Sequence, residues 1–286
     1  MSTWFLISLA SAVTFGLSGF LMKVSSAQSG DDDFLLWGLY LTGSLGFVWW
    51  AVKTGDIQFT WLNLAAGTLV GIGSAFGNLL FMKSLSIGPA SLTSPLANAN
   101  IILTMAMSML VYGESITVTE ATGAFLLVSA IMLLPVDPNE NLRIQNRRWY
   151  LLIFLAMLLF FFRNGGLKIT EEMNLSNTSI LLISYLFGWI WFTWQILRKA
   201  PPAGFRQKSR RTGMVWGLGA GFFSFAGMQL YAIALDHGPA SIIAPIFSTN
   251  SLVVALLSIL VFRERLSLMQ SVSLILLFAG LILIRI

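Results

Sequence analysis

Asn100 and Asn250 are polar side chains placed deep inside long apolar stretches of a chain of 286 residues. An amide carries both hydrogen-bond donors and acceptors, and it is costly in an apolar environment unless those groups are used. The two amides either contact a substrate or join helices by hydrogen bonds, and the sequence leaves both interpretations open. Six further polar residues are candidate substrate contacts of the same kind: Asn78, Gln229, Tyr231, Ser18, Asn98 and Ser248.

Arg163 is the charged residue that lies deepest in an apolar stretch, and Asn164 follows it directly. A guanidinium pairs well with a carboxylate because its planar fork donates two parallel hydrogen bonds. It can also reach the membrane interface along its own aliphatic stem. The sequence therefore makes Arg163 and Asn164 candidate substrate contacts, with an interfacial position for Arg163 as the alternative.

Pro95 and Pro245 each stand inside a stretch that otherwise has the composition of a helix. A proline within a helix removes one backbone hydrogen bond and bends the chain. The two prolines are 150 residues apart, at equivalent positions of the repeat described below. We therefore expect them to form a matched pair of gating bends.

Several kinds of chemistry have no support in the sequence. Cysteine is absent and there is one histidine, so we expect no cofactor and no bound metal. No phosphate-binding loop, nucleophile elbow or zinc-protease motif is present, and we expect no catalytic residues and no enzyme activity. No Asp or Glu lies near the middle of an apolar stretch, which argues against the export of cations in exchange for protons.

The composition of the chain is that of a membrane protein. Hydrophobic residues make up 56% of the chain and charged residues 10%, and the mean hydropathy is +0.80. These values exclude a soluble fold, a nucleic-acid-binding protein and a disordered chain. The sequence predicts a multi-pass protein of the cell membrane (plasma or inner), surrounded by the lipid bilayer and without a nucleic-acid partner.

Ten stretches have the length and composition of a transmembrane helix, which needs about 17–25 mostly apolar residues. Their apolar runs are continuous and do not alternate as the strands of a membrane β-barrel do. The predicted spans are 3–24, 34–52, 61–84, 90–112, 116–135, 149–169, 178–197, 213–235, 240–262 and 267–285.

The chain contains an internal repeat. With a shift of 150 residues, segment 67–134 matches segment 217–284 at 19 of 68 positions, and a shift of 145 aligns the first spans of the two halves. A unit of five spans is therefore predicted twice, over 1–135 and 149–286, with the connecting loop 136–148 between the copies.

Because five is an odd number, the two units must enter the membrane from opposite sides. Similar units of opposite orientation form an inverted repeat, on which many secondary transporters alternate access between the two sides. The predicted fold is an all-α integral membrane protein with ten transmembrane helices arranged as two inverted five-helix repeats.

Several short motifs stand at equivalent positions of the two halves. Gly88-Pro89-Ala90-Ser91 recurs as Gly238-Pro239-Ala240-Ser241, Glu114 and Glu264 close the fourth span of each half, and Lys23 follows Phe15-Gly16-Leu17-Ser18 in the first span. With these motifs and the repeat, the whole chain resembles the drug/metabolite transporter superfamily, specifically its ten-helix EamA-type branch. The resemblance implies a central cavity lined by the fourth and ninth spans. It does not specify the substrate, because the superfamily moves amino acids, drugs, amines, sugars and other metabolites.

Together these features predict a secondary transporter that moves a small polar metabolite, with an amino acid or amine as the first candidates. One alternative is a multidrug or quaternary-ammonium (choline-like) transporter, in which aromatic side chains such as Trp189 and Trp191 would hold the cation. Another is a non-transporting membrane scaffold or an intramembrane enzyme. The expected partner is a small-molecule substrate, and the sequence leaves the oligomeric state open, a monomer included.

The distribution of basic residues predicts an orientation in the membrane. Thirteen of the 17 Lys and Arg residues lie on the side that holds the loops after the odd-numbered spans. Because cytoplasmic loops carry the Lys/Arg excess, we expect both termini to lie outside. Many EamA-type relatives are thought to keep both termini in the cytoplasm.

Overall fold

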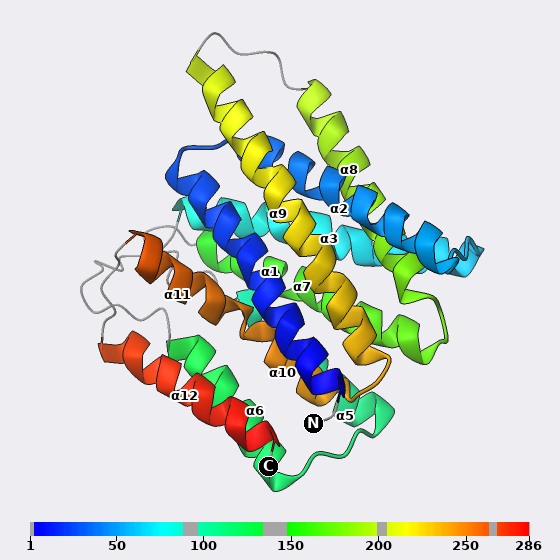
Figure 1. The fold of residues 1–286 in the computed structure, drawn as a ribbon, viewed down its shortest axis with the longest axis vertical. Helices are drawn as coiled ribbons and strands as arrows, with labels where there is room; N and C mark the ends of the chain where they lie inside the picture. The colour runs from blue at the N-terminus through cyan, green and yellow to red at the C-terminus, as the bar shows by residue number, and fades with distance from the viewer. Residues whose placement is uncertain (1–2, 88–96, 134–147, 199–204, 263–267, 286) are drawn as a thin grey trace.

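The computed structural model describes residues 3–87, 97–133, 148–198, 205–262 and 268–285, and the regular structure in these ranges is entirely helical (Figure 1). The predicted all-helical fold is thus confirmed in the described ranges, and the count of ten spans stays a prediction. Six helices are long and apolar enough to cross a membrane: α1 (Thr3–Ala27), α2 (Asp32–Thr54), α3 (Trp61–Ile87), α7 (Arg148–Glu172), α8 (Asn177–Arg198) and α9 (Phe205–Leu235). The other described helices are α5 (Asn100–Tyr112), α6 (Val118–Leu133), α10 (Ala240–Ser248), α11 (Asn250–Phe262) and α12 (Leu268–Arg285).

Local side chains set where α2 begins and ends. The carboxylate of Asp31 accepts hydrogen bonds from the backbone N–H groups of Asp33 and Phe34, which would otherwise lack partners at the helix start. Gly55 ends the helix with a φ of 69°, a left-handed conformation that costs glycine nothing sterically. Because Asp31 and Gly55 fix the two ends of α2, short connections can join this helix to the antiparallel helices before and after it.

The span predicted over 240–262 is not one continuous helix. α10 ends at Ser248, α11 starts at Asn250, and Thr249 lies between them. Pro245 lies inside α10 and has no N–H to donate, so the turn that precedes the break already lacks one backbone hydrogen bond. The interruption falls about one turn after the proline rather than at it.

The first half has an interruption at the equivalent place. α5 starts at Asn100, and Ala99 stands before it, 150 residues ahead of Thr249. Within the described part of the predicted span 90–112, Ala97 and Asn98 are helical, Ala99 is a turn residue, and α5 continues from Asn100. Pro95 lies outside the described residues.

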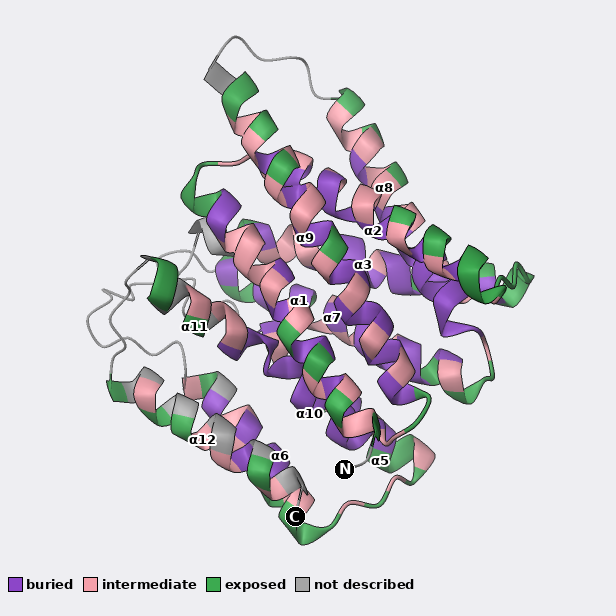
Figure 2. Ribbon diagram, in the orientation of Figure 1, coloured by how far each residue is buried: buried purple, intermediate pink, exposed green. Residues whose placement is uncertain are grey.

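The two halves interlock through their third helices. α3 of the first half packs along α7 and α8 of the second, and α9 of the second half packs along α1 and α2 of the first. α6 and α12 form a separate pair at one edge of the molecule (Figure 1). Buried residues gather where the halves meet, and every residue of α10 is buried (Figure 2). The halves therefore share one core.

Glycines allow the closest helix contacts, and they do so at equivalent positions of the repeat. A Cβ atom at Gly217 of α9 would overlap the carbonyl oxygen of Leu35 in α2. A Cβ atom at Gly67 of α3 would lie 3.1 Å from the carbonyl oxygen of Ile180 in α8. These residues are related by the shifts of 150 and 145. The same relation holds about one turn further on, for Gly221 with Leu39 and Gly71 with Ser184.

Tyr40 of α2 and Tyr185 of α8 cross at the centre of this arrangement. Their ring centroids are 5.4 Å apart. The ring of Tyr40 covers Gly188, and the ring of Tyr185 covers Gly43. Under the shift of 145, Tyr40 is equivalent to Tyr185 and Gly43 to Gly188, so the two ring–glycine contacts are equivalent. A pseudo-two-fold axis therefore passes between the two tyrosines and relates the halves.

We predict that Gly221→Ala destabilises the protein by about 1–3 kcal/mol, because the added methyl group overlaps the backbone of α2 at Leu39. The matched control on the same helix is Gly219→Ala, whose Cβ would meet only the end of the Leu21 side chain, at 3.3 Å. This control is expected to be neutral or slightly stabilising, since alanine favours a helix. Thermal unfolding of the purified protein in detergent measures both, and equal melting temperatures would contradict the prediction.

Candidate functional site

Two hydrogen bonds between buried tyrosines and serines lie at the pseudo-two-fold axis. The hydroxyl of Tyr40 is 2.9 Å from Oγ of Ser74, and that of Tyr185 is 2.6 Å from Oγ of Ser224. The residues of the two pairs are related by the shifts of 145 and 150. Asn78 adds a bond in the first half only, since its Nδ2 donates to the hydroxyl of Tyr40 at 2.9 Å.

Asn100 and Asn250 close the two helix interruptions in the same way. Nδ2 of Asn100 donates to the carbonyl oxygen of Ala97, and Nδ2 of Asn250 donates to that of Phe247, both at 2.8 Å. At each interruption the asparagine thus donates to the carbonyl group of the residue three positions before it. Both amides are buried. The bond of each amide to a nearby carbonyl is local, and substrate contact by either amide stays a prediction.

The symmetry ends at Arg163 and Asn164 of α7. Nε of Arg163 donates to Oδ1 of Asn164 at 3.0 Å, and Nδ2 of Asn164 donates to Oδ1 of Asn100 at 2.9 Å. The equivalent positions in α1 are Ser18 and Gly19, which cannot build such a chain. The hydroxyl of Ser18 donates instead to the carbonyl oxygen of Ala220 at 2.8 Å. The polar chain therefore joins the second half to the interruption in the first.

The guanidinium of Arg163 lies among aromatic rings. Its central carbon is 4.5 Å from the ring centroid of Phe160 and 5.3 Å from that of Phe15, two residues at equivalent repeat positions. The residue is 6% exposed. Within the described ranges no carboxylate lies at ion-pair distance from it. Arg163 is therefore a buried cation without an acidic partner in this part of the chain.

Tyr231 and Gln229 of α9 carry buried polar atoms for which the described residues provide no hydrogen-bond partner. Tyr231 is fully buried and its hydroxyl has no partner, and Oε1 of Gln229 likewise has none. The ring of Tyr231 packs on Phe247 at 4.5 Å between centroids, and Phe247 in turn lies 5.0 Å from Phe15. Tyr231 therefore belongs to the aromatic cluster that contains Arg163.

The remaining predicted residues have structural positions or lie outside the described ranges. Oγ of Ser248 donates to the carbonyl oxygen of Pro245 at 2.7 Å. Asn98 is half-buried just before α5. Pro95, the expected partner of Pro245, cannot be placed because it lies outside the described ranges.

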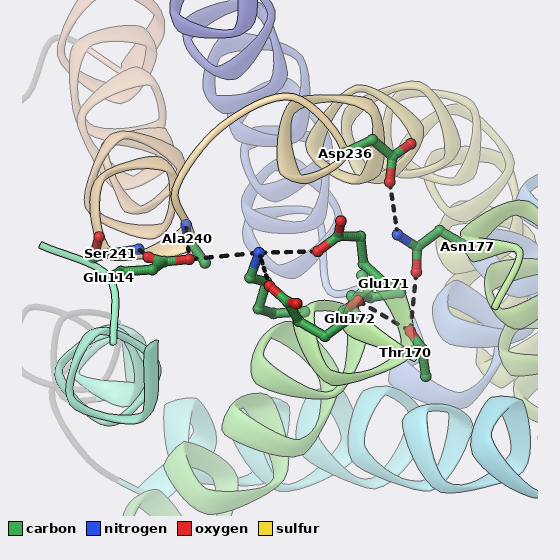
Figure 3. A network of polar contacts seen from close by, with 10 residues as sticks. Glu114, Thr170, Glu171, Glu172, Asn177, Asp236, Ala240 and Ser241 are labelled. Atoms are coloured by element: carbon green, nitrogen blue, oxygen red, sulfur yellow. Dashed lines mark hydrogen bonds and ion pairs between the residues drawn. The ribbon is translucent and has the colours of Figure 1, made fainter. Parts of the chain in front are cut away.

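A polar network ties the halves together (Figure 3), at the end of the bundle where both termini lie (Figure 1), called here the terminal face. Glu114, at the end of α5, accepts hydrogen bonds from the backbone N–H groups of Ala240 and Ser241 at 3.2 and 2.9 Å. A carboxylate is well placed there because the first turn of α10 exposes unpaired N–H groups. The first half is thus bound to a helix of the second.

Lys168 of α7 completes the network. Its Nζ atom lies 3.4 Å from Oε1 of Glu114, 2.9 Å from Oε2 of Glu171 and 2.7 Å from Oε1 of Glu172. Lys168 is 5% exposed, so three carboxylates balance one buried cation. A second link between the halves lies nearby, where Oγ of Ser176 donates to Oδ2 of Asp56 at 2.7 Å.

A pocket of about 500 Å³ opens at the opposite end of the bundle, called here the loop face. The start of α2, the end of α3 and one residue of α8 line it, so both halves contribute. Nε2 of Gln195 donates to Oδ1 of Asp33 across this pocket at 2.7 Å. Its lining residues are Gly30, Asp31, Asp32, Asp33, Leu79, Met82, Lys83 and Gln195.

The model of the EamA-like transporter family matches residues 2–135 and 147–286, nearly the whole chain. The chain belongs to the EamA-like transporter family. A solved structure titled "Crystal structure of protein" aligns over 100% of this chain and 99% of its own, with a TM-score of 0.79 and 12% sequence identity. At that identity the likeness concerns the fold alone. No curated protein matches the chain.

Membership of the family makes the protein a multi-pass membrane protein, and its central residues now divide into two groups. One group is equivalent in both repeats, and sequence reasoning missed its tyrosine–serine bonds. The shifts of 145 and 150 would have found them, because Tyr40 aligns with Tyr185 and Ser74 with Ser224. The other group, Arg163 with Asn164, has no equivalent in the first repeat.

We predict that Asn100→Leu costs this EamA-like protein about 1–3 kcal/mol more stability than Asn250→Leu. Both changes remove one bond to a carbonyl group, but only Asn100→Leu leaves Nδ2 of Asn164 without its acceptor. Asn250→Leu is therefore the matched control. Melting temperatures in detergent report the difference, and a loss as large in the control variant would show that the bond from Asn164 contributes nothing.

Proposed function

We propose that the protein is a secondary transporter that moves a small polar metabolite across the cell membrane by alternating access between its two repeats. The observation that carries the proposal is the pseudo-two-fold core around Tyr40 and Tyr185. Equivalent contacts in inverted repeats allow two arrangements of similar energy, one open to each side. A scaffold without a transport cycle has no need of such symmetry.

The polar contacts are consistent with one of these two arrangements. At the terminal face, Glu114 and Lys168 join the halves, whereas a pocket opens at the loop face. Leu79, which lines that pocket, follows Asn78, and Asn78 hydrogen-bonds to the hydroxyl of Tyr40. With the orientation that the basic residues predict, this arrangement faces the cytoplasm.

An amino acid fits the centre better than a plain amine or a quaternary ammonium ion. Among the described residues, the centre of the bundle contains a buried cation, Arg163, which repels a cationic substrate. A zwitterion brings a carboxylate for the guanidinium and an ammonium group for acceptors such as Oε1 of Gln229, which has no partner. The multidrug and choline-like alternatives have no comparable support here.

Uptake into liposomes tests the proposal. Purified protein is reconstituted, and vesicles are offered labelled amino acids, amines, choline and sugars, with protein-free vesicles as the control. We expect saturable accumulation of at least one amino acid. If no labelled compound accumulates above the control, the transporter assignment to this class of substrates is wrong.

We predict that the terminal-face network acts as a gate whose loss exposes Ser241. The chain has no cysteine, so Ser241→Cys gives a single thiol at a position that is 1% exposed. Adding Glu114→Gln weakens the ion pair with Lys168 and the cap of α10. Together these losses are worth about 2 kcal/mol, which corresponds to a rise in maleimide reaction rate of at least tenfold.

Glu120→Gln is the matched control for Glu114→Gln. Glu120 is also at the terminal face, but its carboxylate accepts only from Thr117 at the start of its own helix. The thiol at position 241 is expected to react in this control as slowly as in the parent protein. Equal reaction rates in both carboxylate variants would mean that the network does not close the face.

A further inference from the structure

The two repeats build a symmetric scaffold, and three positions in and around the Arg163 cluster break its symmetry in the same direction. Arg163 stands opposite Ser18, and Asn164 opposite Gly19. Tyr231 stands at the position that Phe81 occupies in the first repeat. At all three positions the second repeat carries the larger polar group. The symmetric scaffold is built from the contacts that both repeats share. The polar groups found only in the second repeat therefore require another explanation.

Burial of the Arg163 guanidinium costs free energy. A guanidinium at membrane depth is usually paired with an acidic group or reaches the interface, since an uncompensated charge costs several kcal/mol. Arg163 is 6% exposed, and within the described ranges its one hydrogen bond runs from Nε to Oδ1 of Asn164. The faces of Phe15 and Phe160 compensate part of its charge. The remaining N–H donors of the fork are those that an anion would use.

The other buried cation of the described chain provides an internal comparison. Lys168 has the same burial but contacts Glu114, Glu171 and Glu172. Its charge is more than balanced within the protein, so Lys168 has no unmet requirement for an anion. This fold therefore supplies carboxylates where a cation is structural, and it supplies none to Arg163 in the described ranges.

Tyr231 is a second and independent sign of a missing ligand. Its hydroxyl is fully buried without a partner, although an unmade hydrogen bond in such a place costs about 1–3 kcal/mol. Ring contacts connect Tyr231 to the guanidinium of Arg163, since Tyr231 packs on Phe247, Phe247 on Phe15, and the guanidinium lies over Phe15. Phe81, its repeat equivalent, shows that this position accepts a ring without a hydroxyl. One anion would satisfy both groups.

We propose that Arg163 and Tyr231 form a carboxylate-binding site, and that the transported substrate is an organic acid with an apolar body. The guanidinium holds the carboxylate as a fork, and the hydroxyl of Tyr231 donates to the same group. The rings of Phe15, Phe160 and Phe247 surround the apolar part. The transport part of this proposal rests on the proposed function, and the binding part does not.

Matched acids and amides of the same shape test the binding part. Full-length protein in detergent is titrated with benzoate against benzamide and with leucine against leucinamide, together with inorganic phosphate and choline. We expect at least one acid to raise the melting temperature in a saturable way and its amide to raise it at least about tenfold less effectively, because a charged hydrogen-bonded pair is lost. Stabilisation by the amides or by choline at the same concentrations overturns the proposal, as does the absence of stabilisation by either acid at 50 mM (about the limit of useful affinity). Stabilisation by phosphate alone shows an anion site that does not select carboxylates.

Two Tyr→Phe variants separate the site from the scaffold. Tyr231→Phe keeps the ring and removes the unpaired hydroxyl, so the apparent dissociation constant of the acid should rise about three- to tenfold while the ligand-free protein loses no stability. Tyr185→Phe removes a hydroxyl that is bonded to Ser224, so it should lower the melting temperature and leave the affinity unchanged. The reverse pattern overturns the assignment of Tyr231.

Arg163 itself is tested by Arg163→Gln and Arg163→Lys. Acid binding should weaken at least about tenfold in the first and less in the second, which keeps the charge but not the fork. If Arg163→Gln does not fold, Arg163→Lys and Tyr231→Phe still decide the outcome. In proteoliposomes, uptake of amines or sugars without uptake of acids contradicts this site but keeps the transporter. Acid binding without any uptake keeps the site and contradicts the transporter.

Discussion

The close approach of helices from opposite halves is the constraint on which the rest of the structure depends. In lipid, helices gain little from hiding apolar surface from one another, so tight packing and small residues must hold them together. Gly217 allows α9 to rest on the backbone of α2, and Gly67 allows α3 to rest on α8. Because these contacts are equivalent, they fix the pseudo-two-fold axis and the crossing of Tyr40 with Tyr185. That axis in turn sets where α7 and α10 bring their polar groups.

On this scaffold, symmetric and asymmetric polar groups have different roles. Asn100 and Asn250 donate to backbone carbonyl groups at two equivalent interruptions. Arg163 has no equivalent and no acidic partner in the described chain, and Tyr231 has a hydroxyl without a partner. A symmetric carrier must still recognise an asymmetric molecule. The departures from symmetry are therefore the positions at which recognition is expected.

The sequence predicted the helical membrane fold and the repeat because both depend on patterns that are visible in the linear sequence. Composition and length identify spans, and identical residues at a constant shift identify the halves. It also singled out Asn100 and Arg163 correctly as buried polar residues. It did not predict that 240–262 is broken at Thr249, because helix propensity says little about a break at which the side chains of Thr249 and Asn250 donate to carbonyl groups three residues earlier. It could not foresee that Glu114 caps α10, since that contact joins residues 126 positions apart.

The central claim is that the two repeats exchange arrangements around the shared axis, so that one face opens as the other closes. Pulsed electron paramagnetic resonance measures this directly, since the chain has no cysteine of its own. One labelled pair, Val118 with Met173, spans the terminal face, and another, Ala27 with Leu197, spans the loop face; all four residues are exposed. When Glu114→Gln weakens the terminal-face network, the account predicts a longer distance for the first pair and a shorter one for the second. Two distances that stay unchanged, or that change in the same direction, would contradict it.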